Sequence, residues 1–105
     1  MSKIRKEKLL KILHEIKKEL EKEGFLLEGI MGEVEEEWIK FVNICYTLAE
    51  NFEKKHLRSA AILKLLEIKK KISQKVGIDV DIVNVSNLKE LNRNYMYEKL
   101  NFQRV

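Results

Sequence analysis

The sequence predicts an α/β domain with a small mixed sheet flanked by helices, in the order α-β-β-α-β-α with or without a final short strand. Three observations predict this class. Apolar residues recur at helical spacing in the segments 3–23 and 56–76. Apolar runs at 25–32 and 38–48 are typical of strands. Within 76–85, apolar and polar residues alternate, and β-branched residues are frequent, which predicts a third strand.

The first predicted helix carries one apolar stripe on a surface that is otherwise almost wholly Lys and Glu. Ser2 is a suitable N-cap residue, and Gly24 is suited to end the helix. The stripe consists of Leu9, Leu13, Ile16 and Leu20, at spacings of three and four residues.

The two strands that follow differ in character. Gly29 and Gly32 punctuate the first, and glycines there indicate a tight turn or a close backbone approach. The acidic run 33–37 then predicts a solvated loop or a helical turn. The second strand, from Trp38 to Leu48, is apolar on both faces, which predicts a central position in the sheet.

The second half predicts a polar connection of helical character at 49–55 and the longest helix at 56–76. We expect His56 to lie on the surface near the start of this helix. Gly77 ends the helix, and Ser86 suits the start of a short closing helix at 87–94, before an edge strand at 101–105. The inward stripe of the long helix is predicted at Leu57, Ala61, Leu65, Ile68, Ile72 and Val76.

Asp79 and Asp81 are the only two aspartates in the chain, and they lie in the predicted third strand. Side chains two residues apart in a strand point to the same face, so both carboxylates are expected on one face. Ile78, Val80 and Ile82 are expected on the other face.

Length and composition restrict the protein's class. A chain of 105 residues predicts one domain, 1–105, with a single modest core. No apolar run approaches the roughly 20 residues of a membrane helix, and no apolar signal core follows the basic N-terminus, so we expect a cytoplasmic protein. The lone Cys45 lies in an apolar run and is expected to be a buried, inert thiol.

Several strings resemble the minimal nucleotidyltransferase domains of the DNA polymerase beta-like superfamily. Gly29-Ile30-Met31-Gly32 resembles the glycine motif that enters the family's Gly-Ser turn. Residues 65–69 resemble part of its long helix, Val80-Asp81-Ile82-Val83 the strand that bears its third carboxylate, and 86–97 its closing helix. The resemblance implies a nucleotidyltransferase fold, with Gly29 and Gly32 near the nucleotide and Asp81 as a metal ligand.

The sequence departs from the family at the residues that catalysis requires. Nucleotidyl transfer in this family requires Mg²⁺ ions held by clustered carboxylates. Glu33 replaces the family's serine, and the positions of its Asp-x-Asp pair fall on Phe41 and Asn43. Only Asp81 remains of the metal triad. A rearranged site could still combine Asp79 and Asp81 with Glu33 or Glu35, and the two aspartates are otherwise solvated surface residues.

Three hypotheses for function follow. The preferred one is a catalytically degenerate nucleotidyltransferase-like domain, a pseudoenzyme that acts through protein contacts. The resemblance implies a helical HEPN-type partner in a toxin–antitoxin pair as one candidate, and a homodimer is another. The interface would use some of the aromatic residues Trp38, Tyr95, Tyr97 and Phe102.

The second hypothesis is an active, magnesium-dependent nucleotidyltransferase with the rearranged site; otherwise no cofactor is expected. The third is a small nucleic-acid-binding domain that uses Lys69, Lys70, Lys71 and Lys75. The net charge of +4 permits contact with nucleic acid without favouring it, and aromatic residues are not interleaved with these lysines.

Overall fold

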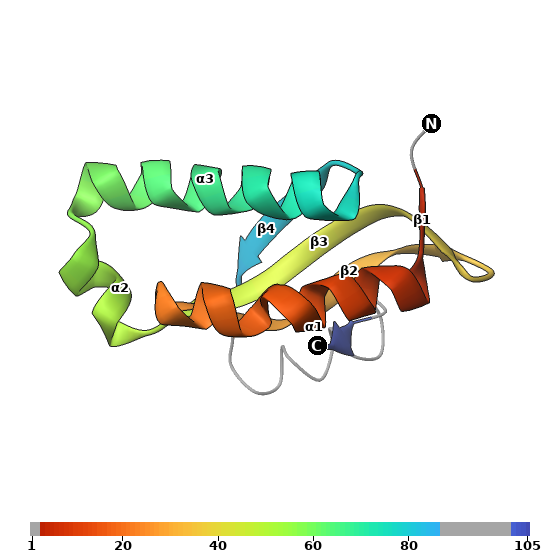
Figure 1. Cartoon of the computed structure of the whole chain (residues 1–105), viewed down its shortest axis with the longest axis horizontal. Helices are drawn as coiled ribbons and strands as arrows, with labels where there is room; N and C mark the ends of the chain where they lie inside the picture. Colours follow the sequence, from red (N-terminus) through yellow and green to blue (C-terminus); the bar gives the residue numbers. More distant parts are fainter. Residues whose placement is uncertain (1–2, 87–101) are drawn as a thin grey trace.

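A computed structural model describes residues 3–86 and 102–105, which form a mixed α/β fold (Figure 1). The α/β class predicted from the sequence is therefore confirmed. The elements in chain order are β1 (Ile4–Arg5), α1 (Lys6–Lys22), β2 (Phe25–Glu35), β3 (Trp38–Leu48), α2 (Glu50–Lys55), α3 (Arg58–Val76), β4 (Val80–Asn84) and β5 (Gln103–Arg104).

β3 is the central strand of the sheet, as its apolar sequence predicts. It pairs with β2 in an antiparallel hairpin along its whole length. On its other edge it pairs with β1 at Trp38 and Ile39, and in parallel with β4 from Val42 to Tyr46. β5 extends the sheet beyond β2, so antiparallel and parallel pairs coexist in one mixed sheet.

The acidic run 33–37 is not the loop or helical turn that the sequence predicts. β2 continues to Glu35, and the turn consists of Glu36 and Glu37 alone, with a positive φ of 57° at Glu36. Pairing with β3 supplies the strand geometry that the acidic residues would not favour by themselves. The end of the hairpin is exposed, so its carboxylates remain solvated and pair with cations: Arg5 lies 3.4 Å from Glu37, and Lys40 lies 2.5 Å from Glu35.

One face of the sheet carries the main core, between the strands and the helices α1 and α3. The two helices run side by side, and α2 bridges their ends at one side of the molecule (Figure 1). All four residues of the predicted α1 stripe are buried, so that prediction is confirmed. The buried β3 residues of this core are Ile39, Val42, Ile44 and Tyr46, and Tyr46 stacks on Phe25 with ring centroids 4.5 Å apart.

The opposite face of the sheet has a smaller apolar cluster around Cys45. Cys45 and Val85 are buried there, with Met31, Val83 and Phe102 packed against them. Burial raises the pKa of the Cys45 thiol to about 11. The thiol is therefore protonated at neutral pH, in agreement with the inert, buried cysteine predicted from the sequence.

The segment expected as one helix at 56–76 is interrupted. α2 ends at Lys55, His56 and Leu57 adopt extended backbone angles, and α3 starts at Arg58. The side chain of His56 is half-buried and packs on Phe52, with ring centroids 4.9 Å apart. The prediction that His56 lies on the surface is therefore wrong. Gly77 ends α3 in the left-handed region, with φ of 82°, as predicted.

The C-terminal half of α3 is packed fully into the core, and the N-terminal half only in part, through the half-buried Ala61 and Leu65. Ile68, Ile72 and Val76 are buried, whereas no side chain from Leu57 to Glu67 is buried. The predicted inward stripe is therefore correct from Ala61 to Val76, fully buried from Ile68 onward, and wrong at Leu57, which is 83% exposed. Helical periodicity locates the inward face of a helix but not the length of helix that has a core beneath it.

At the chain ends, the predicted strand within 101–105 is confirmed by β5. β1 was not predicted, because its two residues continue the charged and apolar pattern of α1. Cation–π contacts help to hold β1 beside β3, because Lys3 lies 4.6 Å and Arg5 5.1 Å from the centre of the Trp38 ring. Because α1 begins at Lys6 with Arg5 as its N-cap residue, the predicted helix start at Lys3 with Ser2 as N-cap is wrong. The predicted closing helix 87–94 lies outside the described residues.

Replacing Leu57 by Ser is expected to stabilise the protein. Leu57 is the N-cap residue of α3, makes no side-chain capping hydrogen bond and is mostly exposed. A serine hydroxyl can accept a hydrogen bond from an unpaired N–H of the first turn, which contributes about 1 kcal/mol. Urea unfolding should report this gain for Leu57→Ser and not for Leu57→Ala, and equal stabilities of the two variants would contradict it.

Candidate functional site

The two glycines of the proposed nucleotide motif do not form a turn. Both lie inside β2, where Gly29 pairs with Cys45 and Gly32 pairs with Val42. A Cβ atom on Gly29 would collide with the Phe102 ring and the backbone of Gln103, and one on Gly32 would collide with the carbonyl oxygen of Phe41. The close backbone approach predicted from the sequence is therefore confirmed, and the tight turn is wrong.

Asn43 and Asp81 do lie side by side. The parallel register of β3 and β4 pairs Asn43 with Asp81, on the face of the sheet opposite the main core. The exposed Asp81 carboxylate lies 3.1 Å from Nζ of Lys69 on α3. The position at which the resemblance implies a second metal-binding carboxylate therefore holds an amide, and the remaining carboxylate is paired with a lysine.

The acidic residues of the rearranged site do not converge. In the register of the sheet, Glu33 on β2 is level with Phe41 on β3, and Phe41 is one residue before the Val42–Val80 pair. Phe41 therefore separates Glu33 from Asp79. Glu35 is paired with Lys40, which donates a hydrogen bond that lowers the pKa of the Glu35 carboxyl. Within 3–86 and 102–105, no three His, Cys, Asp or Glu side chains are grouped so that they could hold a metal ion.

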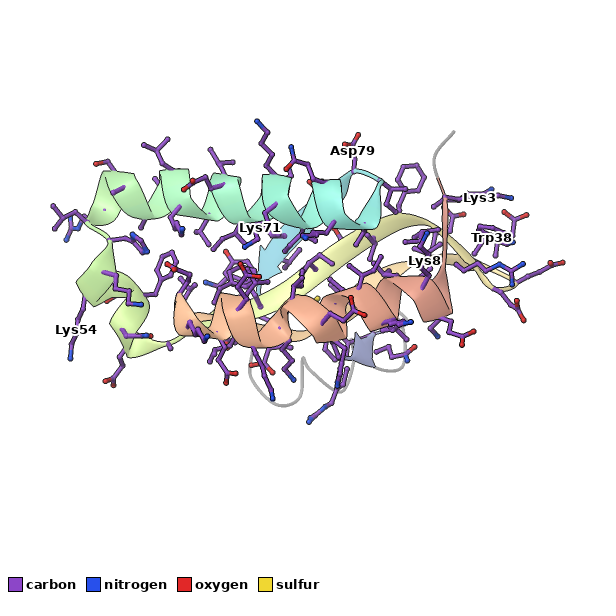
Figure 2. The ribbon with its side chains drawn as sticks, viewed as in Figure 1. Lys3, Lys8, Trp38, Lys54, Lys71 and Asp79 are labelled. Atoms are coloured by element: carbon purple, nitrogen blue, oxygen red, sulfur yellow. The ribbon has the colours of Figure 1, made fainter. Side chains whose placement is uncertain are left out.

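A shallow groove of about 570 Å³ lies where α3 meets the sheet. It occupies the stretch of the β3 edge between the residues paired with β1 and those paired with β4. A second groove of about 480 Å³ shares Phe41, Ser73 and Asp79 with it and extends to Asn43, Lys69 and Asp81. Figure 2 shows Asp79 at the end of α3, pointing away from the molecule.

The chemistry of these grooves suits binding rather than catalysis. Their side chains provide the Lys69–Asp81 ion pair, two amides, a hydroxyl and an exposed aromatic ring, with Phe41 65% exposed. Lys40, Lys70 and Asp79 add further charges to the lining. Ser73 Oγ accepts a hydrogen bond from the backbone N–H of Val80 at 3.3 Å, and this bond links α3 to the start of β4. No histidine or cysteine lines either groove to act on Ser73 as a general base or to serve as a nucleophile.

The four lysines considered for nucleic-acid binding do not act together. Lys69 pairs with Asp81, and Lys71 points toward α1, where it pairs with Glu19 and lowers the pKa of that carboxyl (Figure 2). Lys70 and Lys75 are exposed. The aromatic residues proposed for an interface are also divided, since Trp38 lies under Lys3 and Arg5, Phe102 packs near Cys45, and Tyr95 and Tyr97 lie outside the described residues.

A group of exposed apolar side chains lies on α3, where the sequence analysis placed no site. Ile62, Leu63 and Leu66 are 63%, 65% and 55% exposed, and Leu57 lies exposed before them. The sequence does contain a signal for this surface. Residues 57–66 are apolar around most of the helix circumference, and a helix of that kind has to bury more than one face.

Comparisons with known proteins identify no relative. No family model matches the sequence, and neither a curated protein nor a solved structure matches the chain. In the part of the chain that the structure describes, no helix is both long enough and apolar enough to cross a membrane.

Replacing Gly29 by Ala is expected to destabilise the protein by about 1–3 kcal/mol, the usual cost of overpacking. The added methyl group must displace Phe102 and the backbone of β5. Chemical denaturation measures the loss, and Ala60→Gly, at an exposed helical site, is a control expected to cost only about 1 kcal/mol through helix propensity. Unchanged stability of Gly29→Ala would mean that Gly29 has no packing role and would restore a ligand-binding explanation for it.

Proposed function

We propose that this chain is a protein-interaction domain, a nucleotidyltransferase-like fold without nucleotidyltransferase chemistry. One observation carries the proposal: from Leu57 to Glu67 no side chain is buried, although four of these residues are large and apolar and more than half exposed. Burying a Leu or Ile side chain completely contributes about 1.5–3 kcal/mol. A partner that covers the outer face of α3 therefore gains a substantial apolar contribution.

The arrangement of the sheet is compatible with this proposal. β3 is followed by the helices α2 and α3 and then by β4, parallel to β3, with Asn43 and Asp81 as neighbours. This adjacency supports matching Asn43 and Asp81 to the family's metal-binding positions. Phe41 and Asn43 cannot bind a hard cation as carboxylates do. The resemblance implies a more specific form of this proposal, in which the chain has an antitoxin-like role beside a helical HEPN-type protein.

The interaction surface can be tested in the cells that produce the protein. A photo-crosslinking residue such as p-benzoylphenylalanine placed at Leu63 or Leu66 is expected to form an adduct with a partner protein, because both positions are exposed on the outer face of α3. His14, an exposed residue of α1, provides the matched control position. Adduct bands on denaturing gels, followed by mass spectrometry, give the result.

Two outcomes would contradict the proposal. Crosslinking at Leu63 and Leu66 no stronger than at His14 would mean that α3 is not a preferred contact surface. Calorimetric detection of magnesium-dependent ATP binding that Asp81→Ala abolishes would mean that the carboxylates still act on a nucleotide, and it would favour the enzymatic hypothesis.

A further inference from the structure

We infer that the outer face of α3 binds an acidic amphipathic helix of a partner protein. This inference rests on the proposed interaction function and specifies the partner's chemistry. It follows from the shape of the apolar surface, from the charges around it and from the uncapped start of α3.

The apolar surface has the form of a helix-packing ridge. Ile62 and Leu66 are one turn apart on α3, and Leu63 lies beside them. Ser59, one turn before Ile62, is small enough to let another helix approach closely. α3 lies along one margin of the molecule with α1 on its inner side (Figure 1), so its outer side is open among the described elements. A helix with apolar residues at spacings of three and four can pack against such a ridge.

Beyond Leu66 the same side of α3 leads to Ser73 and to the groove that contains Phe41. Residues 62, 66 and 73 follow the spacing of one helical side, so the ridge and the groove form a continuous path. The exposed Phe41 ring at its end offers a further apolar contact. A docked helix of about three turns would cover the path from Ile62 to Ser73, given a rise of about 1.5 Å per residue.

The segment of chain that carries the ridge is strongly basic. Segment 54–70 contains six cations, Lys54, Lys55, Arg58, Lys64, Lys69 and Lys70, and one carboxylate, Glu67, and so carries a net charge of +5. The whole chain carries +4, so this segment accounts for the entire positive excess. Figure 2 shows Lys54 on α2 directed away from the fold.

Part of this charge is neutralised within the fold and part is available to a partner. Lys64 lies 3.7 Å from Glu23, and Lys69 pairs with Asp81. Glu67 lies 4.0 Å from Lys64. Arg58 and Lys70 are exposed at the two ends of the ridge, and carboxylates of a partner could pair with them there. Lys54 is exposed on α2, and Lys55 donates a hydrogen bond to the carbonyl oxygen of Lys22.

The start of α3 adds to the positive potential. The first turn has no side-chain cap and no acidic residue. Its unpaired N–H groups and the positive end of the helix dipole favour a nearby anion. A carboxylate of a docked helix, close to Arg58, would satisfy both the N–H groups and the guanidinium.

This charge distribution favours a different protein over a second copy of the chain. Two copies packed through α3 would bring two segments of +5 together, and like charges at an interface oppose association. A membrane surface is also anionic, and Leu and Ile can insert into one. The groove that continues the ridge is lined by Ser73, Gln74 and Asp79, polar groups that a peptide helix can pair with and an acyl layer cannot.

The test uses two synthetic helical peptides with the same leucine stripe, one flanked by glutamates and one by lysines. Fluorescence anisotropy should detect binding of the glutamate peptide to the full chain, at least tenfold tighter than that of the lysine peptide, and weakening as NaCl is raised. Leu66→Ser should reduce the affinity at least tenfold. The double variant Arg58→Glu, Lys70→Glu should reverse the preference between the peptides, whereas the control Lys18→Glu, on the exposed side of α1, should leave it unchanged.

Several results would overturn the inference. Equal affinity for both peptides, or binding unaffected by Leu66→Ser, would remove the acidic helix as the ligand. A dimer in sedimentation analysis that Leu66→Ser dissociates would assign the ridge to a second copy. Co-sedimentation with phosphatidylserine vesicles, lost in Leu66→Ser, would assign it to a membrane. If crosslinking at Leu66 yields a partner while the peptides bind equally, the interaction function stands and the acidic helix is wrong.

Discussion

The fold depends on the pairing of β3 with strands on both of its edges. β2 occupies one edge over the full hairpin, while β4 and β1 divide the other between them. β3 is also apolar on both faces, so Val42, Ile44 and Tyr46 hold the helical layer while Cys45 anchors the smaller cluster. Once β3 is placed, the positions of Phe41, Asn43 and Asp81 on the sheet follow from register alone. A one-residue slip would exchange its two faces.

The same arrangement explains why α3 is only half packed. The sheet and α1 provide apolar partners for Ile68, Ile72 and Val76, near the connection to β4. The preceding turns of α3 contact the core only through the half-buried Ala61 and Leu65, and Lys64 adds an ion pair with Glu23. The structure thus presents an apolar helix surface next to a groove in which Asp81 is paired with Lys69. The exposed apolar surface is the observation that supports the proposed interaction function.

Local patterns predicted the elements that depend on local physics. The α1 stripe, the bounds of β3, the end of α3 at Gly77 and the exposure of Asp79 and Asp81 all match the structure. The features that were missed depend on long-range pairing. Glu33 and Glu35 are in a strand because β3 pairs with them, and Leu57 is exposed because no core lies beneath it. Spacing predicted Asp79 and Asp81 on one face but gave no information about Phe41 between Glu33 and Asp79.

The most direct test of the central claim is native-state hydrogen exchange along α3. Because segment 58–67 has no buried side chain and 68–76 contains the buried Ile68, Ile72 and Val76, we expect amides in the first segment to exchange at least tenfold faster, through local opening. Amides of β3 should exchange as slowly as those of the second segment. Uniform protection along the whole of α3 in the isolated protein would contradict the account, because it would mean that the N-terminal half is already stabilised without a partner.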